Sequence, residues 1–110
     1  MTKQEAIDLL LSKGYKEEKY NIEPGCTSYY KRLQGACDCK TNERPPNIGV
    51  SLYQLADNNG IIHNSMKIGL RAETTAGDWC DLNFYGMAFS RLEVIDEFEY
   101  LIEGMWNSIN

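Results

Sequence analysis

The strongest constraint on the fold is an alternation of apolar and polar residues in the middle of the chain. In the run NSMKIGLRAET, residues 64–74, the apolar positions are Met66, Ile68, Leu70 and Ala72. The positions between them are Lys67, Gly69, Arg71 and Glu73. Successive side chains of a β-strand point to opposite faces of a sheet, so this pattern predicts a strand with one buried face.

Three other segments also indicate strands, either by alternation or by enrichment in aromatic and β-branched residues: 26–33, 47–55 and 79–87. In the last of them, Cys80, Leu82 and Phe84 fall on the apolar side. The turn DNNG at 57–60 contains Asn and Gly, which suit positive φ. Such short links favour an antiparallel meander of about four strands.

A short amphipathic helix is expected before this sheet, over residues 3–13. Thr2 and Glu5 have the spacing of a capping box, in which each residue satisfies a backbone N–H of the other. Gly14 stands where a left-handed C-terminal cap is expected.

A longer helix is expected after the sheet, opened by a second capping box of Ser90 and Glu93. Its apolar side chains share an arc of about 140° on a helical wheel. They are Val94, Ile95, Phe98, Leu101, Ile102, Met105, Trp106 and Ile109. The sequence therefore predicts a single α+β domain over residues 1–110, in the order α-β-β-β-β-α, with both helices on the apolar sheet face.

The net charge lies near one end of the chain. The sequence has 16 acidic and 11 basic residues, a formal net charge of −5. Five acids and no base follow Arg91, so the charges of residues 1–91 sum to zero. This argues against binding of nucleic-acid phosphates through the last segment, because such binding requires Lys and Arg.

The composition, 43% hydrophobic and 25% charged, is typical of a globular protein. No apolar stretch approaches the ~20 residues needed to cross a bilayer, and the first residues lack the features of a signal peptide. We therefore expect no membrane contact and a cytoplasmic location in which the four cysteines stay reduced.

The motif GACDCKTNERPP raises the question of a metal site. Cys37 and Cys39 are one residue apart, whereas zinc sites usually use C-x2–4-C pairs. A site completed by Cys26 and His63 is the alternative to a connecting loop that contains thiols. The loop is the favoured interpretation, so we expect no metal, no cofactor and a contact role for residues 34–46.

No catalytic residues are expected, and the protein is interpreted as non-enzymatic. A cysteine or serine nucleophile needs an adjacent base and a third group that orients it. The single histidine, His63, stands beside the DNNG turn in no recognised motif.

The polar side of the expected sheet gathers aromatic and basic residues. They are Tyr53, Lys67, Arg71, Trp79 and Tyr85. An uncovered patch of this kind is typical of a contact with a protein or a ligand. The 34–46 loop or a second copy in a homodimer could instead cover it. The alternative function is a small-molecule or nucleotide-binding protein that uses this face and the loop.

The acidic side of the last helix is the main candidate for a partner-binding surface. Its residues are Glu93, Asp96, Glu97, Glu99 and Glu103, with Tyr100 as an aromatic anchor. Carboxylates that face a basic groove speed encounter and make association fall with salt. The competing interpretation is a solvated helix face whose first acids complement the helix dipole.

The α-β-β-β-α order resembles double-stranded RNA-binding domains, but their last helix begins with a basic cluster and this one begins SRLEVIDEFE. The segment EVIDEFEYLIEG, with Glu73, Asp78 and Asp81, is more similar to the small inhibitors that phages encode against bacterial defence systems, anti-CRISPR proteins among them. That resemblance implies an inhibitor of a nucleic-acid-handling protein, acting in the cytoplasm of the host cell. It also implies a protein partner with a basic surface and no direct contact with nucleic acid.

Overall fold

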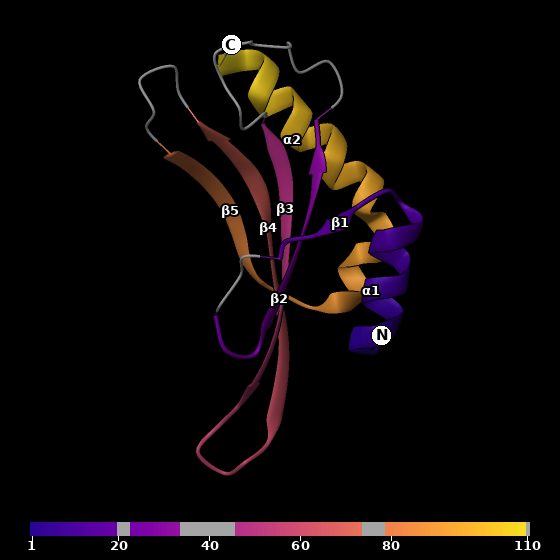
Figure 1. Cartoon of the computed structure of the whole chain (residues 1–110), viewed down its shortest axis with the longest axis vertical. Coiled ribbons are helices and arrows are strands. Elements are labelled where there is room, and N and C mark those ends of the chain that lie inside the picture. Colours follow the sequence, from indigo (N-terminus) through magenta and orange to yellow (C-terminus); the bar gives the residue numbers. More distant parts are fainter. Residues whose placement is uncertain (20–22, 34–45, 74–78, 110) are drawn as a thin grey trace.

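The computed structural model describes residues 1–19, 23–33, 46–73 and 79–109. These segments form a helix, five strands, a 3-10 turn and a second, longer helix, in that order (Figure 1). The strands make one antiparallel sheet in the order β1-β2-β3-β4-β5, so each strand pairs with its neighbours in sequence. The predicted α+β meander between two helices is confirmed.

The elements lie close to the predicted ranges. The helical segments are α1 (Lys3–Ser12), the 3-10 segment η1 (Phe89–Val94) and α2 (Ile95–Ile109). The strands are β1 (Lys16–Glu17), β2 (Cys26–Arg32), β3 (Asn47–Ala56), β4 (Ile62–Glu73) and β5 (Trp79–Met87). Within the described residues, no helix is both long and apolar enough to cross a membrane.

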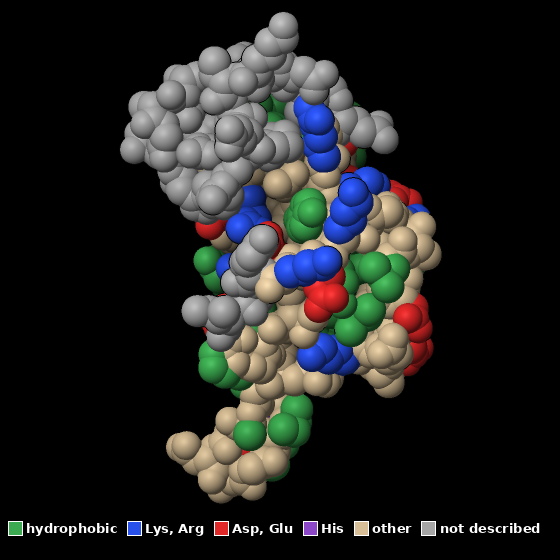
Figure 2. All heavy atoms as spheres, viewed as in Figure 1, with side chains coloured by type: hydrophobic (Ala, Val, Ile, Leu, Met, Phe, Trp, Pro, Cys, Tyr) green, Lys and Arg blue, Asp and Glu red, His purple; other side chains and the backbone are tan. Residues whose placement is uncertain are grey.

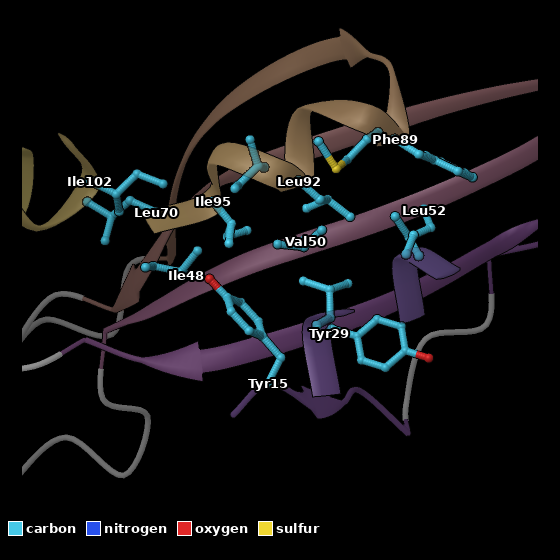
Figure 3. Close-up of a cluster of buried hydrophobic side chains, with 14 of the residues drawn as sticks. Tyr15, Tyr29, Ile48, Val50, Leu52, Leu70, Phe89, Leu92, Ile95 and Ile102 are labelled. Atoms are coloured by element: carbon cyan, nitrogen blue, oxygen red, sulfur yellow. The ribbon is translucent and has the colours of Figure 1, made fainter. Parts of the chain in front are cut away.

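One face of the sheet and the helical segments enclose a hydrophobic core (Figure 3). Met66, Ile68 and Leu70 of β4 are fully buried, as the alternation predicts. Leu10 of α1 and Ile102 of α2 reach the same core. Full burial of one such side chain contributes ~1.5–3 kcal/mol, so the apolar sheet face determines where the helices pack.

Both predicted caps of α1 are confirmed. Thr2 Oγ1 accepts the Glu5 N–H at 3.1 Å, and the Thr2 N–H donates to Glu5 Oε1 at 3.1 Å. At the other end, Gly14 has φ +89°, and the Tyr15 N–H donates to Leu10 O at 3.0 Å. This left-handed cap turns the chain back along β2, so that the unexpected two-residue strand β1 forms and Tyr15 enters the core.

The predicted second capping box is wrong. The helical segment begins one residue before Ser90, as the 3-10 turn η1, and its N-cap Ala88 makes no side-chain hydrogen bond. A 3-10 helix has three residues per turn, which aligns side chains three positions apart. Phe89, Leu92 and Ile95 have this spacing and are all buried, so packing of this row determines the start of the helix.

The β3–β4 hairpin continues beyond the body of the sheet as an arm, residues 55–63, which gives the molecule extents of 47 × 26 × 21 Å (Figure 1). Its turn is held by the Asp57 carboxylate, which accepts the N–H groups of Asn59 and Ile61 at 2.8 and 3.0 Å. The second oxygen of Asp57 lies 2.7 Å from His63 Nε2. The DNNG turn is therefore braced by its first residue.

The outermost strand, β5, is not covered by the helices. Leu82 and Phe84 pair with Leu70 and Ile68 across the sheet, which confirms their predicted side. They nevertheless remain 45% and 46% exposed. Figure 1 shows why: α1 lies toward the β1 side of the sheet, and β5 lies at the opposite edge.

Candidate protein-binding surfaces

The outward side of α2 carries an acidic and aromatic surface, which we call the outer face and define by Glu93, Glu97 and Tyr100. Glu93 belongs to η1, and the other two follow at helical spacing, so all three lie along one line. Tyr100 is 78% exposed. Among the described residues, neither Glu93 nor Glu97 has an ion-pair or hydrogen-bond partner. The outer face thus remains open to a partner.

Glu99, predicted to belong to the same surface, points into the molecule instead. Only 15% of its side chain is exposed, and both of its oxygens lie 3.3 Å from Lys31 Nζ on β2. It also accepts the Tyr15 hydroxyl at 3.0 Å. Burial, and then the nearby Glu99 carboxylate, raise the pKa of Tyr15, which therefore stays a neutral donor. Glu99 holds α2 against β2 and is not available to a partner.

Asp96 and Glu103 are intermediate between the exposed acids of the outer face and the largely buried Glu99. Asp96 sits 3.0 Å from Lys13 Nζ, in an exposed ion pair that joins the end of α1 to the first turn of α2. Glu103 is half-buried. One signal in the sequence could have separated the acids. Glu99 is four residues after Ile95 and three before Ile102, which places it beside the buried side chains of the helix.

The polar side of the sheet brings together four of the five predicted residues: Tyr53, Lys67, Arg71 and Tyr85. The side chain of the fifth, Trp79, lies outside the described part of the structure. Lys67 Nζ stands 5.9 Å from the centroid of the Tyr85 ring. A β-bulge helps to present this ring, because Tyr85 and Gly86, with φ +70°, face the single residue Lys67.

Arg71 is engaged within the molecule and does not project from the sheet. Its guanidinium lies 3.5 Å from Glu18 of the β1 end and 3.8 Å from Asp81 of β5. The side chain therefore crosses β3 above Gly49, where an added Cβ would come within 2.5 Å of Arg71 Cδ. Gly49 leaves room for a cation that links strands on both sides of β3.

Tyr53 is likewise held by neighbouring polar groups. Its hydroxyl donates to Glu23 Oε2 at 3.5 Å. Burial, and then the neighbouring Cys26 and Glu23, raise the pKa of Tyr53 to about 12. Beside it, the buried hydroxyls of Ser28 and Ser51 lie 2.8 Å apart. This part of the polar face is satisfied internally. Among the predicted residues of this face whose side chains are described, Lys67 and Tyr85 make no such internal contact apart from the one with each other.

Basic side chains gather over the part of the molecule where β1 and β2 lie, with fewer carboxylates among them (Figure 2). Lys16, Lys31 and Arg32 belong to these two strands. In contrast, α2 carries four acids and no base.

The thiol and histidine hypotheses receive no support from the described residues. Cys26 is half-buried, and its Sγ lies 3.6 Å from Ser28 Oγ. His63 pairs with Asp57 at the tip of the hairpin arm, and this contact, with the Ile61 N–H, holds the pKa of Asp57 below its usual value. No group of three potential metal ligands occurs in this part of the chain. Cys37 and Cys39, with the 34–45 segment, lie outside it.

The chain matches no protein-family model, no curated protein and no solved structure.

Proposed function

We propose that the protein is a non-enzymatic binding module whose outer face of α2 docks on a basic surface of a protein that handles nucleic acid. The single observation that carries this proposal is the exposed line of Glu93, Glu97 and Tyr100. On binding, the module would occupy the surface that otherwise holds nucleic-acid phosphates and would act as an inhibitor.

An exposed aromatic ring beside the acids supports this proposal over a passive solvated face, because the helix dipole alone would account for acids in the first turn of α2. Glu93 and Glu97 are four residues apart, and like charges at this spacing destabilise a helix by roughly 0.2–0.5 kcal/mol. No described cation relieves this repulsion. Tyr100 adds a large aromatic group, of the kind enriched at the centres of interfaces. A basic partner would relieve the repulsion and cover the ring.

The experiment compares two variants with the same charge change. The first, Glu93→Lys/Glu97→Lys, reverses the outer face. The second, Asp8→Lys/Glu17→Lys, reverses two exposed acids on α1 and β1. The free energy of unfolding of each variant should differ from that of the parent by no more than about 0.5 kcal/mol per substitution, because exposed charges contribute little to stability.

Partners are captured from host-cell extract with the parent and both variants, and the protein retained by the parent is purified and titrated. We expect the outer-face variant to lose binding and the matched variant to retain it. The affinity of the parent should fall as salt rises, and nucleic acid should compete. Equal losses in the two variants, or an affinity insensitive to salt, would contradict the proposal.

A second candidate function, binding of a small anionic or nucleotide-like ligand, is favoured by the Lys67–Tyr85 pair. A cation beside an exposed ring can hold an anionic group and stack a planar one. Titration with nucleoside phosphates, followed by the NMR shifts of Lys67 and Tyr85, tests this function. Absence of saturable shifts at millimolar ligand excludes it.

A further inference from the structure

The two edges of the sheet differ in how they are protected. β1 is two residues long and exposes the charged Lys16 and Glu17, which are devices that discourage pairing with another strand. β5 is nine residues long, and its one such device among the described residues is the bulge at Tyr85 and Gly86 near its end. The one charged side chain described on it, Asp81, lies on the polar face within 3.8 Å of Arg71. No described strand pairs with the outer edge of β5 (Figure 1).

An apolar strip runs beside the part of this edge that precedes the bulge. We define the strip as Leu82, Phe84, Val94 and Leu101. All four are large side chains between 39% and 57% exposed. The first two lie on the helix side of β5. The other two lie on the flank of the helical segment opposite Glu99, which contacts β2, and therefore on the flank toward β5. A strand edge and an apolar surface thus coincide.

We propose that β5 pairs with β5 of a second copy of this chain, giving a two-fold symmetric dimer in which the two sheets are continuous. The symmetry of a strand that pairs with its own copy favours a second copy of this chain as the partner of β5. Residues directly opposite each other in an antiparallel pair lie on the same face of the sheet. When a strand pairs with its own copy about a two-fold axis, the apolar sides of both copies therefore always coincide.

The position of the axis follows from charge and from the bulge. An axis at Asp81 would bring two like charges together, and an axis beyond Phe84 would place the bulge at Tyr85 and Gly86 at the centre of the pairing and not at its end. An axis at Asn83 places Leu82 opposite Phe84 of the second copy and Phe84 opposite its Leu82. The two Asp81 side chains then stand about 14 Å apart along the strands, at roughly 3.4 Å per residue. This separation exceeds the ~8–10 Å over which exposed charges interact in salt.

This pairing also explains why the β1 edge is the more strongly protected of the two. The dimer uses both β5 edges and leaves the two β1 edges at its ends, where short charged strands stop further growth. A dimer built this way is closed. The apolar strips of the two copies meet over the seam, which removes them from water.

The experiment measures the molar mass of the purified full chain by light scattering and sedimentation equilibrium. The parent should show twice the 12.6 kDa of the chain. Leu82→Lys/Phe84→Lys, which places charges on the inner side of the edge, should reduce the mass to that of one chain. Leu55→Lys is the control, because Leu55 is 49% exposed on the hairpin arm, and it should leave the doubled mass unchanged.

Hydrogen exchange of the parent gives a second measurement that needs no variant to fold. The β5 amides that do not donate to β4 should be protected at high concentration and should exchange rapidly after dilution below the dimer dissociation constant. A parent of 12.6 kDa at millimolar concentration, or outward β5 amides that exchange equally fast at all concentrations, overturns the proposal.

Discussion

Replacing Glu99 by glutamine tests whether an interior acid holds α2 on the sheet. Its carboxylate accepts the Tyr15 hydroxyl at 3.0 Å and lies 3.3 Å from Lys31 Nζ. Glutamine has nearly the same size, so the substitution removes charge and leaves the packing in place. Lys31, whose side chain is 26% exposed, then loses its counter-ion.

The expected loss in the free energy of unfolding is about 2 kcal/mol. A hydrogen bond to a charged group contributes roughly 1.5–3 kcal/mol, and the glutamine amide keeps a weaker, neutral acceptor for Tyr15. Breaking a fully buried ion pair costs about 3–5 kcal/mol. Solvent reaches both partners of this pair, so the loss of the Lys31 attraction adds at most about 1 kcal/mol.

Urea unfolding of Glu99→Gln, Lys31→Met and the double variant measures this coupling as a double-mutant cycle. Glu97→Gln is the matched control, since Glu97 is exposed on the same helix without a described partner, and its change should stay within about 0.5 kcal/mol. If Glu99→Gln costs no more than Glu97→Gln, Glu99 does not hold the helix. If the two single changes simply add, the Lys31 pair contributes nothing to this hold.

Two further predictions concern the sheet and Tyr15. Gly69→Ala should lower the urea midpoint by the equivalent of about 1–3 kcal/mol, because the new Cβ meets the fixed backbone carbonyl of Leu82. Gly49→Ala should cost less, since it meets only the movable Arg71 side chain, and equal losses would refute this contrast. The raised pKa of Tyr15 means that the folded state keeps this proton when the unfolded chain loses it near pH 10. The stability that this group contributes is present below pH 10 and is lost as the pH rises above it. The urea midpoint of Tyr15→Phe should therefore fall less steeply with pH above 10 than that of the parent. Equal dependence on pH in the two proteins would refute this.

The strands could be predicted because their side chains alternate with the period of the backbone itself. In 64–73 this alternation determines which residues are buried, and the structure confirms it from Met66 to Ala72. The cap of α1 was predictable for the same reason, since the Thr2–Glu5 bonds and the left-handed Gly14 depend only on nearby residues. An interaction can be predicted from the sequence when the residues that make it are close together in the chain.

The surfaces were harder to predict from the sequence, because they depend on which helices and strands lie next to one another in the fold. A helical wheel gives the direction of Glu99 around α2 and says nothing of Lys31, which lies 68 residues away in the sequence. The apolar arc predicted for the last helix also includes Val94 and Leu101, yet these side chains are 39% and 57% exposed. The Ser90 cap failed because burial of Phe89 and Leu92 outweighed a single side-chain hydrogen bond.

The contact between Tyr15 and Glu99 joins residues 84 positions apart, whereas every strand pairs with its neighbour in the chain. Closing a loop of that length directly from the unfolded chain costs about 4 kcal/mol of entropy. A meander assembled one hairpin at a time divides this cost into short closures, each stabilised by its own strand pairing. Folding should therefore begin in the hairpins and end when α1 and α2 come together on the apolar face of the completed sheet. Changes at Glu99 should accordingly speed unfolding and leave the folding rate nearly unchanged.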